Sequence, residues 1–142
     1  MIEKILCATD GSHSARKAVD FAAGLARQCD AHVAFLVVNT VTEEKLRTTA
    51  GWNAEELGAA RAQIRGELDH AREVAQKECA DFGLHEAEGR NVAETIVAFA
   101  RSRGCDHIVV GSAGRTGLTA ALIGSVARRV VIQATCPVTV VR

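Results

Sequence analysis

A glycine-rich segment in the last third of the chain carries residue types that can hold an anion. Gly111-Ser-Ala-Gly114 is followed, after nine further residues, by Gly124-Ser125. The apolar run at 107–110 before it is typical of a buried strand, and a helical pattern follows it. Glycines between a strand and a helix let backbone N–H groups approach an anion, and the helix N-terminus adds the positive end of its dipole. The segment therefore predicts a phosphate site.

The spacing of these glycines excludes the two commonest phosphate loops. The segment contains no Gly-Lys-Ser or Gly-Lys-Thr, so the lysine of a Walker A loop is absent, and it lacks the dinucleotide pattern G-x-G-x-x-G. The alternative to a phosphate site is a glycine-rich turn that holds no ligand. Four glycines among 14 residues cost conformational entropy unless the backbone geometry needs them, which favours a site.

The elements that must position this segment alternate along the whole chain. Continuous apolar runs and a weaker fifth strand are separated by helical patterns, which predicts a parallel sheet covered on both faces. Right-handed crossovers then favour an α/β fold with a doubly wound five-stranded parallel sheet, Rossmann-like in class. The expected strands are 5–8, 33–38, 84–89, 107–110 and 138–141, and the expected helices are 15–26, 54–82, 91–103 and 125–134.

Ligands of such sheets bind at the carboxyl ends of the strands, where the strand order reverses. The ends of the first strand, at Asp10, and of the fourth, at Gly111, are the candidates for that point. Asp10 also suits a turn, and Ser12 suits a helix cap. In the long helical stretch, Glu67 is grouped with the charged residues that face water, and Gly83 is expected to end the helix.

Composition narrows the function classes. A chain of 142 residues is long enough for one domain with a core, and its formal net charge is zero. No basic stripe with interleaved aromatic residues occurs, which argues against nucleic-acid binding. No apolar run reaches the roughly 20 residues of a membrane span, and the first residues predict a strand rather than a signal peptide. We therefore expect a cytoplasmic protein without membrane contact.

Side chains that could catalyse a reaction or hold a metal are scattered. The five cysteines form no CxxC, and most lie in apolar stretches, which predicts buried, reduced thiols. The five histidines include no pair with metal-ligand spacing. No Ser–His–Asp order or paired-carboxylate motif stands out. The sequence therefore predicts neither a catalytic residue nor a metal ligand.

Taken together, these motifs resemble the universal stress protein family. The family's nucleotide signature, Gly-x2-Gly-x9-Gly-Ser/Thr, stands at Gly111, Gly114, Gly124 and Ser125. The opening Ile-Leu-Cys-Ala-Thr-Asp-Gly-Ser at 5–12 and the closing Cys-Pro-Val-Thr-Val-Val at 136–141 add to it. The resemblance covers the chain and implies one domain over 1–142 with an adenine nucleotide alpha hydrolase-like fold. It also implies membership of the branch whose signature binds the ribose and phosphates of ATP.

The resemblance implies a role for each position near the base and sugar. Asp10 would lie beside the adenosine, and Val38, ending the second strand, would pack on the adenine. Gly111 and Gly114 would let the loop approach the ribose and phosphates.

The resemblance also implies the phosphate contacts. Gly124, Ser125 and Val126 would open the last helix, where N–H groups and the Ser125 hydroxyl bind phosphate oxygens. Arg115 either pairs with a phosphate or is an ordinary surface arginine. Ala113 departs from the family's common form, because many members have a polar residue or histidine there.

The resulting interpretation is a cytoplasmic ATP-binding regulatory or stress-response protein, with Mg²⁺ brought by the triphosphate. The strand Val138–Val141 is expected at a sheet edge, where it would pair two copies in a homodimer, unless a loop covers it. One alternative is an enzyme that slowly hydrolyses ATP or phosphorylates itself at Ser125 or Ser112. Another is an interaction module that binds no nucleotide, or binds AMP.

Overall fold

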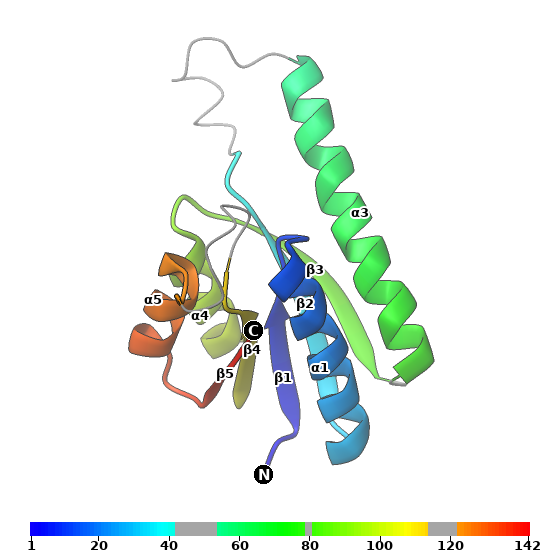
Figure 1. Cartoon of the computed structure of the whole chain (residues 1–142), viewed down its shortest axis with the longest axis vertical. Helices are drawn as coiled ribbons and strands as arrows, with labels where there is room; N and C mark the ends of the chain where they lie inside the picture. Colours follow the sequence, from blue (N-terminus) through cyan, green and yellow to red (C-terminus); the bar gives the residue numbers. More distant parts are fainter. Residues whose placement is uncertain (42–53, 79–80, 114–121) are drawn as a thin grey trace.

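The computed structural model describes residues 1–41, 54–78, 81–113 and 122–142. Five parallel strands form one sheet in the order β3-β2-β1-β4-β5, with helices between them, so the predicted fold class is confirmed (Figure 1). The strands are β1 (Lys4–Ala8), β2 (His32–Asn39), β3 (Phe82–Glu88), β4 (His107–Gly111) and β5 (Val138–Val141). The helices are α1 (His13–Cys29), α3 (Ala54–Glu78), α4 (Val92–Ser102) and α5 (Ser125–Gln133).

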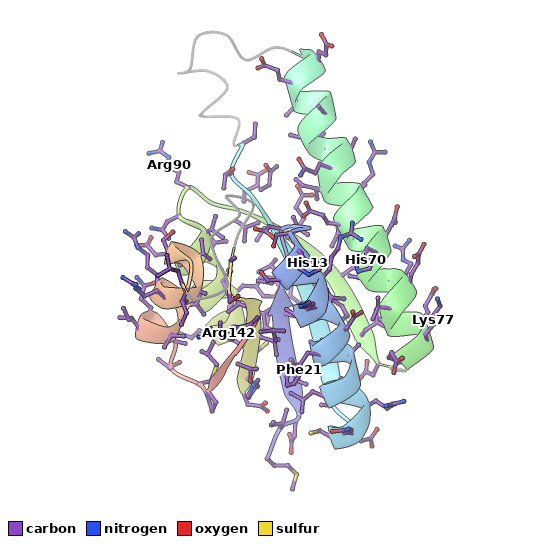
Figure 2. All side chains as sticks on the ribbon, viewed as in Figure 1. His13, Phe21, His70, Lys77, Arg90 and Arg142 are labelled. Atoms are coloured by element: carbon purple, nitrogen blue, oxygen red, sulfur yellow. The ribbon has the colours of Figure 1, made fainter. Side chains whose placement is uncertain are left out.

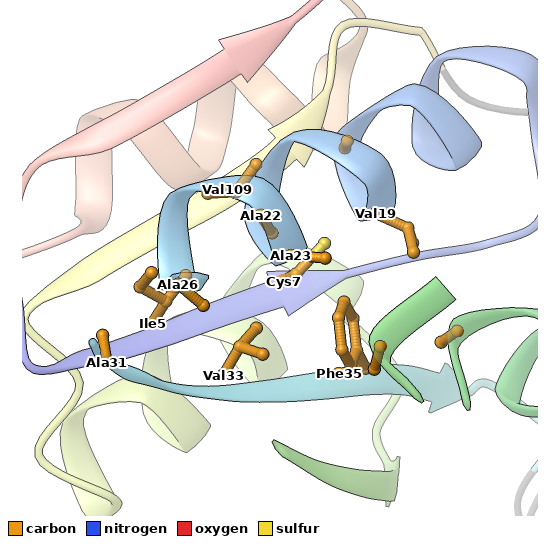
Figure 3. Packing of buried hydrophobic residues seen from close by; sticks show 13 residues of the cluster. Ile5, Cys7, Val19, Ala22, Ala23, Ala26, Ala31, Val33, Phe35 and Val109 are labelled. Carbon is orange, nitrogen blue, oxygen red and sulfur yellow. The ribbon is translucent and has the colours of Figure 1, made fainter. Parts of the chain in front are cut away.

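Helices cover both faces of the sheet, and the strands divide their side chains between two apolar clusters. Ile5 and Cys7 of β1 pack with α1 and α3 on one face, and Leu6 packs with α4 and α5 on the other. Figure 3 shows the first cluster, in which Phe35 of β2 lies near Cys7. Because both faces are covered, the central strands contain continuous apolar runs rather than apolar residues at alternate positions.

Capping side chains fix where two of the helices begin. The Ser12 hydroxyl accepts a hydrogen bond from the Ala15 N–H at 3.3 Å, and the Asn91 side chain accepts one from Glu94 at 3.0 Å. The cap at Ser12 agrees with the sequence prediction. The predicted end of the long helix is wrong, because α3 ends at Glu78 and Gly83 lies within β3.

The two edges of the sheet are β3 and β5, and the edge position was predicted for β5. The prediction of buried thiols is only partly right: among the described cysteines, Cys7 is buried, Cys29 is exposed, and Cys105 and Cys136 are half-buried. Burial raises the pKa of the Cys7 thiol, so it is unsuited to nucleophilic chemistry. Across the described part of the chain, no helix is long and apolar enough to cross a membrane.

We expect Phe35→Ala to lower the free energy of unfolding by about 3–5 kcal/mol, because it empties a fully buried site in the core. Phe21→Ala is the matched control, because Phe21 lies on α1 with 44% of its surface exposed (Figure 2). Its cost should stay below about 1 kcal/mol. Urea denaturation followed by circular dichroism measures the free energy of unfolding of both variants. An equal loss of this free energy in the two variants would contradict this description of the core.

Candidate functional site

The strand order reverses between β1 and β4, which are neighbours in the sheet. The chain leaves β1 through α1 toward β2 and leaves β4 toward α5 and β5, so the two connections diverge on opposite faces. Divergent connections open a crevice outside the carboxyl ends of such strands. The segments after Ala8 and after Gly111 border this crevice.

A cavity of about 500 Å³ lies at these strand ends. Its walls come from the ends of β1, β2 and β4, from α3, and from the starts of α1 and α5. Six residues named from the sequence line it together: Asp10, Val38, Gly111, Gly124, Ser125 and Val126. The two other named residues, Gly114 and Arg115, lie outside the described part of the chain. The volume is within the range of small-molecule sites in proteins.

The turn between β1 and α1 explains why a glycine follows Asp10. Gly11 has φ +77°, a left-handed conformation that residues with a side chain rarely adopt. The Asp10 carboxylate accepts a hydrogen bond from the Ser12 N–H at 3.0 Å, and the Thr9 hydroxyl accepts one from the Gly11 N–H at 3.3 Å. Asp10 thus shapes the turn and also lines the cavity, so the two roles predicted for it are compatible.

Two serines of α1 hold the segment that follows β4. The Ser14 hydroxyl donates to the Ala113 carbonyl at 2.6 Å and accepts from the Ala113 N–H at 3.1 Å. The Ser12 hydroxyl also approaches that carbonyl, at 3.2 Å, in addition to capping the helix. At position 113 these contacts use the backbone and not the side chain. The sequence interpretation gave Ser12 only a cap and did not single out Ser14.

Gly111 meets a steric requirement that the glycine pattern alone did not reveal. A Cβ at this position would lie 2.6 Å from the Ser14 hydroxyl oxygen and 2.7 Å from the Ala15 backbone nitrogen. No left-handed φ is involved, so the requirement is space for α1. Gly111 therefore allows α1 to pack directly on the end of β4, while its other side borders the cavity.

The N-terminus of α5 provides backbone donors at the cavity. Gly124 is the N-cap and makes no side-chain cap, and the first turn contains no acidic residue. The first helical hydrogen bond runs from the Arg128 N–H to the Gly124 carbonyl at 3.0 Å. The N–H groups of Ser125, Val126 and Ala127 precede this bond, and all three residues line the cavity. This end of the helix can bind an anion.

The end of β2 gives the cavity an apolar side. Leu36, Val37 and Val38 line it, together with Ile96 of α4. The buried Asn39 supports this strand end: its amide nitrogen donates to Glu86 at 3.2 Å, and its side-chain oxygen accepts from the Val41 N–H at 2.9 Å. This side can accommodate a flat apolar group.

A wall from α3 was missed by the sequence interpretation. Ala60, Gln63, Ile64 and Glu67 share one face of α3 and line the cavity. Glu67 was expected to face water, but only 7% of its surface is exposed. The signal that could have found it is spacing, because Glu67 lies three residues after Ile64 and four before the buried Ala71, on the inward stripe.

The described residues include no group of three or more His, Cys, Asp or Glu side chains that could hold a metal ion. Burial also raises the pKa of the Cys105 and Cys136 thiols, and it lowers the pKa of His107. None of these three side chains lines the cavity. The lining instead offers backbone donors, carboxylates, hydroxyl and amide groups, and apolar side chains.

Comparisons with known proteins cover the chain from end to end. The model of the family described as the universal stress protein family matches residues 1–142. The chain is 35% identical to universal stress protein MJ0531 of Methanocaldococcus jannaschii, over 100% of this chain and 83% of that protein. The fold is similar to that of hypothetical protein MJ0577, at 26% identity and a TM-score of 0.81 over 99% of this chain and 96% of that one. It is also similar to a universal stress protein in complex with cAMP, at 26% identity and a TM-score of 0.76 over 99% and 97%.

We expect Gly111→Ala to lower the free energy of unfolding by about 1–3 kcal/mol, because the new methyl group would displace the backbone of α1. Gly24→Ala is the matched control within α1, where an added Cβ meets nothing within 4 Å. That change should stabilise the protein by about 0.5–1 kcal/mol, as alanine does inside a helix. Denaturant titration compares the free energies of unfolding of the two variants. An unchanged free energy of unfolding in Gly111→Ala would disprove the steric role.

Proposed function

The chain belongs to the universal stress protein family, and from this premise we propose that it is an ATP-binding regulatory protein of the stress response. The ATP would occupy the cavity at the carboxyl ends of β1, β2 and β4. One observation carries the proposal: the first turn of α5, with three backbone N–H groups that precede its first helical hydrogen bond and no acidic side chain, lines a cavity that apolar residues from the end of β2 also line. A nucleotide combines these two chemistries in one molecule.

The phosphates would bind at the start of α5. Ser125, Val126 and Ala127 offer backbone N–H groups, Ser125 adds a hydroxyl, and Gly124 opens the helix, while its own N–H donates to the Ser112 carbonyl. The helix dipole adds to their attraction for an anion. Gly114 and Arg115 would extend this subsite, in line with the family signature. Mg²⁺ would arrive with the triphosphate and keep most of its water ligands, which is its usual behaviour beside phosphates.

The adenine would lie against the apolar side, with Val38 packed on the ring. The similarity to a universal stress protein that binds cAMP supports an adenine nucleotide as the ligand. The proposal places the protein in the cytoplasm, where ATP is available. Binding would report nucleotide occupancy rather than drive turnover, because the phosphate loop contains no Walker A lysine.

We also propose that two copies associate through the β5 edge of the sheet. β5 pairs with β4 on one side and ends the sheet on the other, so its outer backbone groups are available to a second strand. Val131 and Ile132 of the adjacent α5 expose apolar surface, to 51% and 74%. An open strand edge bordered by apolar side chains favours association.

We expect Ser125→Pro to weaken ATP binding about tenfold or more, because it removes both an N–H and a hydroxyl donor to a charged phosphate. Proline is tolerated at the first position of a helix, and the extended backbone of Gly124, with ψ 161°, suits a residue before proline. Ser125→Ala keeps the N–H and should weaken binding less. Calorimetric titration measures the dissociation constant of ATP for the unaltered protein, Ser125→Pro and Ser125→Ala.

The matched control for this series is His13→Pro. It places proline at the first position of α1, after a cap of similar backbone conformation, on an exposed residue that does not line the cavity. ATP should raise the melting temperature of the unaltered protein, with about 2.7 kcal/mol of stabilisation at a hundredfold excess over the dissociation constant. If no such shift occurs, the proposed function is wrong. Phosphate release, or a phosphoryl mass gain that Ser125→Ala removes, would favour the enzyme instead.

We expect Ile132→Glu to shift the protein from dimer toward monomer, because a charge would enter the apolar contact beside β5. Gln133→Glu is the control, since it adds the same charge at the next exposed position of α5. Sedimentation velocity reports the assembly state. A protein that is monomeric before any substitution would refute the dimer.

A further inference from the structure

Glu67 is a charged side chain buried in the wall of the candidate nucleotide cavity. Only 7% of its surface is exposed, so Glu67 is more than nine-tenths buried. It lies on α3, far along the chain from the glycine signature. Burying a carboxylate is costly unless polar groups meet it. An ionised carboxylate only accepts hydrogen bonds, and Glu67 lines the cavity in addition to making contacts within the protein. The ligand that meets Glu67 must therefore offer a hydrogen-bond donor.

The turn after β1 fixes where the Glu67 carboxylate lies. A Cβ on Gly11 would lie 2.9 Å from the Glu67 Oε1, so the carboxylate lies directly against this turn. Gly11 carries no side chain that could separate the backbone of the turn from the Glu67 carboxylate. Asp10 borders the same part of the cavity. The carboxylate of Glu67 is thus placed at the end of β1.

The sheet order assigns the parts of a nucleotide to three strand ends. β1 lies between β2 and β4 in the sheet. The apolar base subsite is at the end of β2, and the donors for phosphate follow β4 at the start of α5. In a nucleotide the sugar joins the base to the phosphates, so the sugar must cross the end of β1. That is where Glu67 and Asp10 lie.

We propose that Glu67 is a specificity-determining residue that accepts a hydrogen bond from the ribose hydroxyls of the bound nucleotide. This inference rests on the proposed function and adds the sugar to it. The hydroxyls are the donors that a nucleotide carries in this position, whereas a phosphate placed there would meet like charge. Carboxylates at β1 and helix N–H groups at α5 together orient the ligand. The cavity therefore selects a ribonucleotide over a nucleotide whose sugar lacks hydroxyls.

The test compares the dissociation constants of ATP and 2′,3′-dideoxy-ATP. The unaltered protein should prefer ATP about tenfold or more, the size of a hydrogen bond to a charged group. Glu67→Ala should reduce that preference to about threefold or less, and Glu67→Gln, which keeps a neutral acceptor, should lie between them. Glu73→Gln is the matched control, because Glu73 is exposed on the same helix and does not line the cavity. It should retain the full preference.

Three outcomes separate the possibilities. Equal affinity for ATP and dideoxy-ATP in the unaltered protein overturns the inference and leaves the proposed function standing. An undiminished preference in folded Glu67→Ala also overturns it, because the selection then arises elsewhere. If the unaltered protein binds neither nucleotide, the proposed function fails and the inference fails with it. Thermal melting of each variant verifies folding.

Discussion

The close contact between the start of α1 and the end of β4 is the constraint on which the site depends. It exists because Gly111 has no side chain, so the backbone of α1 reaches the strand, and because Ser14 bonds both backbone groups of Ala113. The same segment then holds α5, since the Gly124 N–H donates to the Ser112 carbonyl at 2.6 Å. A continuous series of short contacts thus runs from α1 through the end of β4 to the N-terminus of α5.

This arrangement gives the cavity two electrostatically different sides. Backbone donors at the start of α5 attract negative charge, while Asp10 and Glu67 at the end of β1 repel it and accept hydrogen bonds. The end of β2 adds an apolar surface beside them. Such a cavity orients a long ligand in one direction. Its donors are backbone groups fixed by the fold, and the proposed nucleotide binding depends on this geometry.

Particular residues show how far sequence reasoning reached. The alternation of apolar runs and helical patterns predicted the sheet, and the residue types predicted the cap at Ser12, since these depend on neighbours in the chain. The ends of β1 and β4 were predicted to mark the reversal of strand order, and they do. The end of the long helix was wrong because Gly83 was interpreted as a helix terminator, whereas strand pairing places it in β3.

The sequence by itself determined the order and type of the elements, because hydrophobic period, caps and glycine spacing are local properties. It also brought out the family signature in which Gly111 and Gly124 stand. Only the tertiary structure decided that Gly111 makes room for α1 and that Glu67 lies against Gly11. Both facts depend on how closely segments distant in the chain pack together. That distance is set by the folded core, and no local pattern records it.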